Sequence, residues 1–127
     1  MTRPRVLVAE DDPVVMTLLL SLLESLDCEP VGVRDGEAAW ERVRQGPPLD
    51  LVLTDVAMPR VSGMALLVAV RQALPALPVV VMSGDYQNRG PALRAGASAF
   101  LLKPFGWAEL EGILRRVPVR ARERLGA

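Results

Sequence analysis

The strongest constraint on this chain is a regular alternation between short apolar runs and longer helix-like stretches. Three of the runs, beginning at Val6, Leu51 and Val79, are apolar at successive positions, which favours strands buried on both faces. A stretch with helical spacing follows each run, and this β-α unit occurs five times along the chain. The repeat predicts a single α/β domain with a doubly wound parallel sheet and helices on both sides.

The expected elements follow from these runs and from the proline and glycine residues between them. We expect strands at Val6–Ala9, Val31–Val33, Leu49–Thr54, Val79–Met82 and Phe100–Leu102. We expect helices at Pro13–Leu26, Glu37–Gln45, Met64–Leu74, Pro91–Ala95 and Trp107–Val117. Asp12-Pro13 fits a helix N-cap followed by a proline in the first turn. The domain is expected to occupy residues 1–118, with 119–127 as a short basic tail or the start of a linker.

Composition excludes several classes of function. Fifteen Lys and Arg residues balance fifteen Asp and Glu residues, so charge predicts neither direct nucleic-acid binding nor membrane binding. The lone Cys28 excludes an internal disulfide, and no apolar stretch is long enough to span a bilayer, so we expect a cytoplasmic protein. The chain contains no histidine, which excludes histidine acid–base catalysis, histidine metal ligands and an internal phosphohistidine donor.

Charged and polar residues close the predicted strands. Glu10-Asp11-Asp12 follow the first strand, Asp55 the third, Ser83 the fourth and Lys103-Pro104 the fifth. In an open α/β sheet these strand ends share one edge, where ligands bind. Crowded carboxylates persist by sharing a proton or binding a cation, and an all-oxygen set favours Mg²⁺. A carboxylate beside Mg²⁺ can accept a phosphoryl group, whose other oxygens Lys103 and Ser83 would neutralise or bind.

Five segments, in this order, resemble the receiver domains of two-component response regulators, and the match runs from about Arg5 to Val117. The segments are Val6–Asp12, Asp50–Pro59, Gly63, Val79–Gly84 and Ala95–Phe105. The resemblance implies a five-stranded parallel sheet of order 2-1-3-4-5, which is a flavodoxin-like three-layer sandwich. It implies a signalling domain that catalyses only its own phosphorylation and dephosphorylation. The implied donor is an external histidine kinase or histidine phosphotransfer protein, and the output partner is unknown; a phosphorylation-dependent homodimer is a further implied state.

The resemblance also assigns the phosphoryl site and the metal site. Asp55 is the expected phosphoacceptor. Mg²⁺ is expected among Glu10, Asp11, Asp55 and the backbone carbonyl of Ala57. Glu10 stands where aspartate is commonest in the family. Because its side chain is one methylene longer, we expect it to reach the metal through water.

Three further positions match the switch of the family. Ser83 has the place of the switch hydroxyl, Phe100 that of the switch aromatic and Lys103 that of the conserved lysine. In such domains the bond corresponding to Lys103-Pro104 is cis, which is accessible because proline follows. We expect the Ser83 hydroxyl to move toward the phosphoryl oxygens and Phe100 to follow it. Core packing is the alternative for Phe100.

Two departures from the family pattern keep other functions open. The segment from Ser83 to Lys103 is about two residues shorter than usual, which puts the fourth helix in doubt. This departure slightly favours a phosphorylation-independent, receiver-like interaction module. A second alternative is a Mg²⁺-dependent phosphohydrolase with an aspartate nucleophile. Ala57 argues against it, because related enzymes carry a second acid two residues after the nucleophile.

The apolar residues of the first helix predict which face meets a partner. One stripe at helical spacing is assigned to the core: Val15, Leu18, Leu19, Leu22, Leu23 and Leu26. Met16 and Leu20 lie off this stripe, four residues apart, so we expect them on an outer face beside the Asp55 pocket. A histidine-bearing helix is expected to dock there, and methionine suits such a surface because its side chain adapts. The alternative is that the C-terminal helix or tail covers Leu20.

Overall fold

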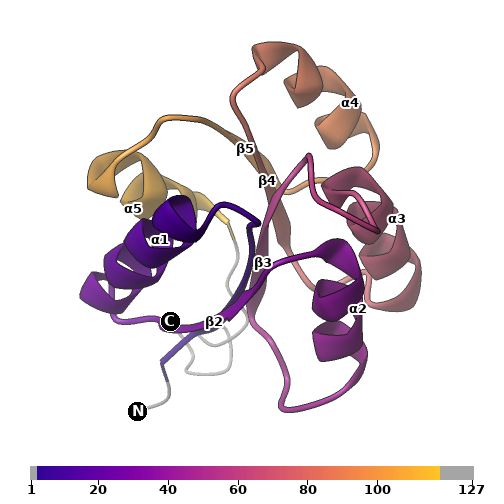
Figure 1. Cartoon of the computed structure of the whole chain (residues 1–127), viewed down its shortest axis with the longest axis horizontal. Coiled ribbons are helices and arrows are strands. Elements are labelled where there is room, and N and C mark those ends of the chain that lie inside the picture. Colours follow the sequence, from indigo (N-terminus) through magenta and orange to yellow (C-terminus); the bar gives the residue numbers. More distant parts are fainter. Residues whose placement is uncertain (1–2, 118–127) are drawn as a thin grey trace.

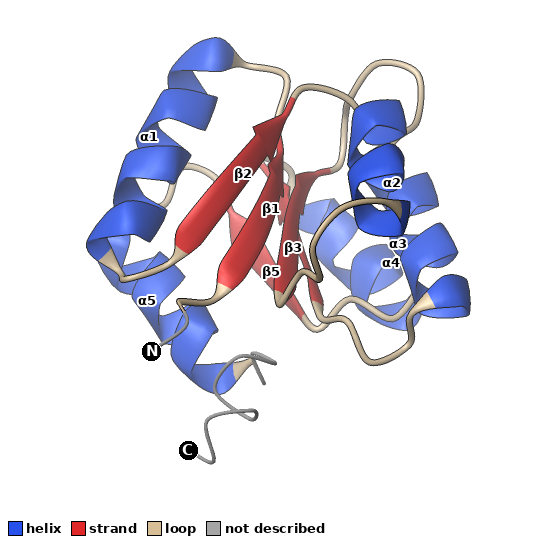
Figure 2. Cartoon of the chain, turned by 90° about the horizontal axis from the view of Figure 1, so that it is seen from below, coloured by secondary structure: helices blue, strands red, loops and turns tan. Residues whose placement is uncertain are grey.

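The computed structural model describes residues 3–117, which form one five-stranded parallel sheet between two layers of helices (Figures 1 and 2). The strands are β1 (Arg5–Ala9), β2 (Glu29–Val33), β3 (Leu51–Asp55), β4 (Val79–Ser83) and β5 (Ala99–Leu102), in the order β2-β1-β3-β4-β5. The helices are α1 (Pro13–Ser25), α2 (Gly36–Arg44), α3 (Gly63–Ala73), α4 (Arg89–Arg94) and α5 (Trp107–Arg116). The order confirms the predicted doubly wound fold.

The expected elements all occur, and their ends differ from the prediction by at most two residues. The fourth helix is indeed short. It begins at Arg89 rather than Pro91, directly after a 3₁₀ turn, η1 (Tyr86–Asn88). Pro91 lies in the first turn of α4, where its missing N–H leaves no helical hydrogen bond unmade. The predicted tail at 119–127 lies outside the described residues.

Each face of the sheet has its own apolar cluster. One cluster joins the sheet to α1 and α5, and the other joins it to α2, α3 and α4 (Figure 1). Along β3, Leu51 and Leu53 belong to the first cluster and Val52 to the second. Successive side chains of a strand point to opposite faces, so a strand covered on both faces must be apolar at every position. This explains the continuous apolar runs.

No helix within residues 3–117 is long and apolar enough to cross a lipid bilayer.

The rotation of α1 on the sheet corrects the predicted partner face. Met16 and Leu20 are half-buried and pack against the core rather than facing outward. They lie beside Gly32 of β2, where an added β carbon would come within 2.9 Å of the Met16 sulfur. Leu18, predicted in the core, is 53% exposed, and Val14 is 77% exposed. The outer apolar face of α1 is therefore formed by Val14 and Leu18, because the glycine on β2 makes room for the methionine.

Two glycines fix the loop that follows β3. A β carbon on Gly36 would lie 1.9 Å from the Val61 carbonyl oxygen, and one on Gly63 would lie 1.9 Å from the Asp55 carbonyl oxygen. The Gly63 N–H donates to the Val56 carbonyl over 2.9 Å. The first turn of α3 thus contacts the backbone at the end of β3 at a distance that only glycine allows. These contacts set the position of Asp55.

Replacing Gly63 by alanine should destabilise the fold, because the new methyl group must displace backbone atoms rather than a flexible side chain. We expect Gly63→Ala to lower the free energy of unfolding by about 2 kcal/mol or more in urea denaturation. Gly112→Ala in α5 is the control, since no heavy atom other than its chain neighbours and nearby helix backbone lies within 4 Å of its added methyl group. This control should gain about 0.5 to 1 kcal/mol from helix propensity. Equal effects of the two substitutions would contradict the close approach at Gly63.

Candidate functional site

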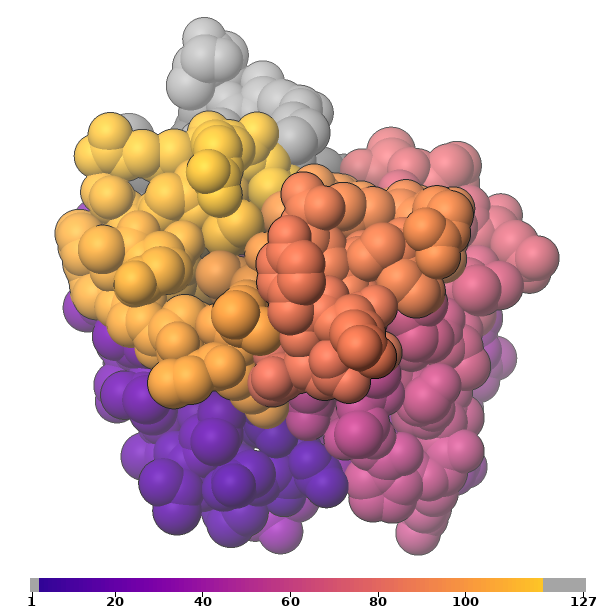
Figure 3. Space-filling view, turned by 90° about the horizontal axis from the view of Figure 1, so that it is seen from above, coloured from indigo at the N-terminus to yellow at the C-terminus, as the bar shows by residue number. Residues whose placement is uncertain are grey.

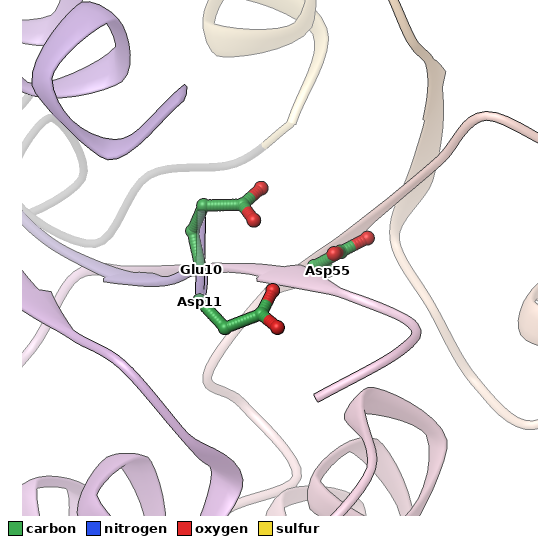
Figure 4. Close-up of side chains that lie close together, drawn as sticks. All are labelled: Glu10, Asp11 and Asp55. Carbon is green, nitrogen blue, oxygen red and sulfur yellow. The ribbon is translucent and has the colours of Figure 1, made fainter. Parts of the chain in front are cut away.

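Three carboxylates meet at the C-terminal edge of the sheet. Glu10 and Asp11 directly follow β1, and Asp55 is the last residue of the neighbouring strand β3 (Figure 4). One oxygen from each of the three lies within 4.8 Å of the others. Glu10 is buried, Asp55 is partly exposed and Asp11 is exposed, so the cluster opens to solvent on the Asp11 side. The predicted convergence of these acids is therefore confirmed.

The Lys103 ammonium lies between two of these carboxylates. Its Nζ is 2.6 Å from Glu10 Oε1 and 3.4 Å from Asp55 Oδ2. The second Glu10 oxygen accepts a hydrogen bond from the Asp12 N–H over 3.1 Å. Glu10 is only 1% exposed, and a buried carboxylate is stable only with such partners. Lys103 follows β5 and begins a cis peptide bond to Pro104, as expected.

The surroundings of Asp55 and Lys103 shift both pKa values upward. Burial raises the pKa of the Asp55 carboxyl, and the charge and hydrogen bond of Lys103 offset this only in part. Burial by itself lowers the pKa of Lys103, but the hydrogen bond from its ammonium to Glu10 and the charges of Asp55 and Glu10 raise it by more. Lys103 is therefore a cation at neutral pH, and Asp55 is a carboxylate whose ionisation is disfavoured by burial.

The donor set fits a hard divalent cation. All three groups are carboxylates, without nitrogen or sulfur ligands, as Mg²⁺ prefers. Asp11 is exposed, so a cation can reach the cluster from solvent on this side. One Asp55 oxygen accepts a hydrogen bond from the Val56 N–H over 2.9 Å. Both Glu10 oxygens already have partners, which suits contact with a metal through water. Ala57 is exposed two residues beyond Asp55, and a metal contact of its carbonyl stays a prediction.

The two predicted switch residues lie on neighbouring strands. Ser83 ends β4 and is buried, and its carbonyl accepts from the Lys103 N–H over 2.8 Å. Phe100 lies on β5, half-buried, with its ring centroid 6.4 Å from that of Tyr86 in an edge-to-face contact. Sequence reasoning missed Asn88, whose amide nitrogen donates to the Ser83 hydroxyl over 2.8 Å. No motif marks this residue, because the contact depends on how the short η1 turn folds.

A model of the response regulator receiver domain family matches residues 6–115 of the chain. The chain belongs to this family. Receiver domains bind Mg²⁺ at an acidic site and work in two-component signalling rather than as classical enzymes. The acidic edge described above is therefore the candidate functional site of this receiver domain.

One similar protein is the transcriptional regulator NtrC of Rhizobium meliloti. It is 34% identical over 126 residues, which make up 98% of this chain and 26% of NtrC. The chain spans only 14% to 26% of the length of the first four curated relatives it matches. The similarity therefore concerns one part of each relative, and this part is the receiver domain.

Solved structures confirm the fold of the receiver domain. A response regulator receiver domain from Clostridium thermocellum superposes with a TM-score of 0.86 at 24% identity, over 98% of this chain and 99% of that one. The response regulator TrrA from Thermotoga maritima, solved in complex with Mg²⁺-BeF, has a TM-score of 0.83 at 24% identity. That match covers 90% of this chain and 98% of TrrA.

Asp55→Asn should make the receiver domain more stable than wild type at neutral pH in the absence of Mg²⁺. Because the folded-state pKa of Asp55 lies above its ordinary 3.8, the folded state binds the proton more tightly than the unfolded chain. The contribution of Asp55 to wild-type stability should therefore fall as pH rises through the interval between these two values and stay lower above it. Asparagine does not ionise, so urea denaturation from about pH 4 to pH 8 should show the advantage of the variant growing with pH. A wild type more stable than Asp55→Asn at pH 7 would contradict this view of the site.

Proposed function

We propose that this receiver domain accepts a phosphoryl group on Asp55 from an external phosphohistidine protein and changes its surface in response. The observation that supports this most directly is the placement of Asp55. Its carboxylate is partly exposed and lies close both to the Lys103 ammonium and to the exposed carboxylate of Asp11. A nucleophile, a cation and a metal-binding acid are thus within reach of one bound phosphoryl group.

The proposed transfer is a simple exchange of bonds. An Asp55 carboxylate oxygen attacks phosphorus, and the phosphorus–nitrogen bond of the donor imidazole breaks as the new phosphorus–oxygen bond forms. The leaving imidazole nitrogen takes up a proton from solvent. The donor histidine must lie outside these 127 residues, since they contain no histidine. Mg²⁺, held by Asp11 and Asp55 and through water by Glu10, would supply charge neutralisation for the phosphoryl oxygens.

Lys103 and Ser83 would bind the remaining phosphoryl oxygens. Lys103 is already 3.4 Å from Asp55, and the dianionic phosphoryl group offers it a stronger partner than Glu10 alone. The Ser83 hydroxyl lies on the adjacent strand and can donate to a second oxygen. Phe100 would then adjust beside Ser83 and alter the surface near η1 and α4.

The alternative is a receiver-like module that binds its partner without phosphorylation. The short α4, only six residues long, is the observation that favours it. The two functions differ in a single measurable property, because only the first requires covalent labelling of Asp55.

With Mg²⁺ and phosphoramidate, the wild-type chain should gain the mass of one phosphoryl group in intact mass spectrometry. Asp55→Asn should abolish the gain, and Asp11→Ala should abolish it through loss of the metal. Asp12→Asn is the matched control, because asparagine caps α1 as well as aspartate does. Stoichiometric labelling of Asp55→Asn would disprove the assignment of the acceptor. A wild type that binds Mg²⁺ but never labels would support the phosphorylation-independent module.

The outer face of α1 is the surface we assign to the phosphohistidine partner. Val14 and Leu18 are exposed there, and Leu18 also borders an apolar groove of about 140 Å³. The groove runs between α1 and the loop after β5, and its walls include Pro104, Phe105 and Lys103. Because Lys103 lines this groove and also contacts Asp55, a helix that inserts one apolar side chain into the groove would hold its phosphohistidine beside the acceptor.

Charged residues on this face should slow phosphoryl transfer from the partner protein without changing the reactivity of Asp55. We expect Val14→Lys with Leu18→Glu to slow transfer more than tenfold, which corresponds to about 1.4 kcal/mol. The donor is the phosphohistidine protein that labels wild type fastest in a panel, and labelling by phosphoramidate should be unchanged. Val68→Lys, a 45% exposed apolar site on α3, is the control. If both donors slow together the pair is structural, and if neither slows the partner docks elsewhere.

A further inference from the structure

The Ser83 hydroxyl is held by two donors. The Asp85 N–H donates to Ser83 Oγ over 3.0 Å, and Asn88 Nδ2 donates to the same oxygen over 2.8 Å. Ser83 is 5% exposed, so water competes little for these bonds. A serine oxygen has two acceptor positions and one proton. Both acceptor positions are filled, so the hydroxyl can form a further hydrogen bond only as the donor.

This restriction suits the proposed chemistry. A phosphoryl dianion on Asp55 has only acceptor oxygens, so it needs a hydroxyl that donates. The bonds from Asp85 and Asn88 do not have to break when Ser83 donates to a phosphoryl oxygen. They also strengthen that donation, because a hydroxyl that accepts hydrogen bonds is polarised into a better donor.

The Asn88 side chain does not form the capping hydrogen bond that is usual at its position. It stands at the N-cap of α4, where an asparagine side chain usually accepts a hydrogen bond from the first turn of the helix. The side chain makes no such capping bond and is directed to Ser83 instead. Its backbone is fixed by the bond from the Asn88 N–H to the Asp85 carbonyl over 3.1 Å. The backbone of the η1 turn thus places the Asn88 amide next to the Ser83 hydroxyl.

The same turn connects Ser83 to the surface. Tyr86, at the start of η1, is 62% exposed and meets Phe100 edge-on, while Asn88, at its end, holds Ser83. Figure 3 shows this segment and α4 in orange on the surface, between α5 in yellow and α3 in pink. A displacement of Ser83 toward Asp55 would draw Asn88 with it and move η1 against Phe100.

We propose that Asn88 is a positioning residue for phosphoryl binding: it keeps the Ser83 hydroxyl a donor toward the phosphoryl group on Asp55 and transmits the movement of Ser83 to η1 and α4. This inference rests on the proposed function of Asp55. It adds a residue to the site that acts through Ser83 and does not touch the phosphoryl group.

The first test is the initial rate of Asp55 phosphorylation by phosphoramidate at saturating Mg²⁺. Asn88→Ala should lower this rate by about threefold to tenfold, the range expected for one neutral hydrogen bond. Gln87→Ala, an exposed neighbour on the same turn, should leave it unchanged. In a Ser83→Ala background, Asn88→Ala should have no further effect, because its action passes through the hydroxyl. An equal loss in both backgrounds, or a faster Asn88→Ala, would overturn the proposal.

Asn88→Asp provides a second test with almost no change in shape. A carboxylate can only accept, so it should capture the Ser83 proton and lower the rate to that of Ser83→Ala. Amide exchange of residues 86–94 should change on phosphorylation in wild type and not in Asn88→Ala. If wild type labels and Asn88→Ala stays within about twofold of it, only this inference fails. If wild type never labels on Asp55, the proposed function and this inference fail together.

Discussion

The ion pair between Glu10 and Lys103 is the constraint on which the rest of the site depends. Glu10 is almost wholly buried after the first strand, and the Lys103 ammonium 2.6 Å away and the Asp12 N–H both stabilise its charge there. The lysine is 93 residues further along the chain. The contact therefore ties the loop after β5 to the end of β1, and the same lysine reaches Asp55 between them. Pairing the buried acid thus places a cation beside the proposed nucleophile.

The pair also explains how a crowded acidic site can be stable and still reactive. Three carboxylates share the edge, yet only one ammonium lies close to them within residues 3–117. Three carboxylates against one ammonium leave the site with excess negative charge, and burial raises the pKa of Asp55 despite the lysine. A divalent cation relieves that imbalance, and a bound phosphoryl group offers Lys103 an alternative to Glu10. In the proposed cycle, the lysine that pairs with Glu10 at rest is therefore the same lysine that binds the phosphoryl oxygens.

Much of the fold and the acidic edge could be predicted from the sequence, because each depends on a local pattern. Continuous apolar runs predicted strands covered on both faces, and strand ends predicted where Asp11, Asp55 and Lys103 would meet. The rotation of α1 could not be predicted in this way. Eight of the thirteen residues of that helix are Val, Leu or Met, so its sequence does not clearly distinguish the Leu18 face from the Met16 face. The deciding contact is with Gly32 on another element. Asn88 was missed for a similar reason, since its partner is set by the η1 turn.

A crystal structure of the wild-type chain with Mg²⁺ and beryllofluoride tests the central claim most directly, because beryllofluoride stands in for the phosphoryl group. We expect beryllium bonded to an Asp55 carboxylate oxygen, with Mg²⁺ on Asp11 and Asp55. Lys103 Nζ and Ser83 Oγ should each lie within about 3 Å of a fluorine. Beryllofluoride bound away from Asp55, or Lys103 still paired only with Glu10 beside an occupied site, would contradict it.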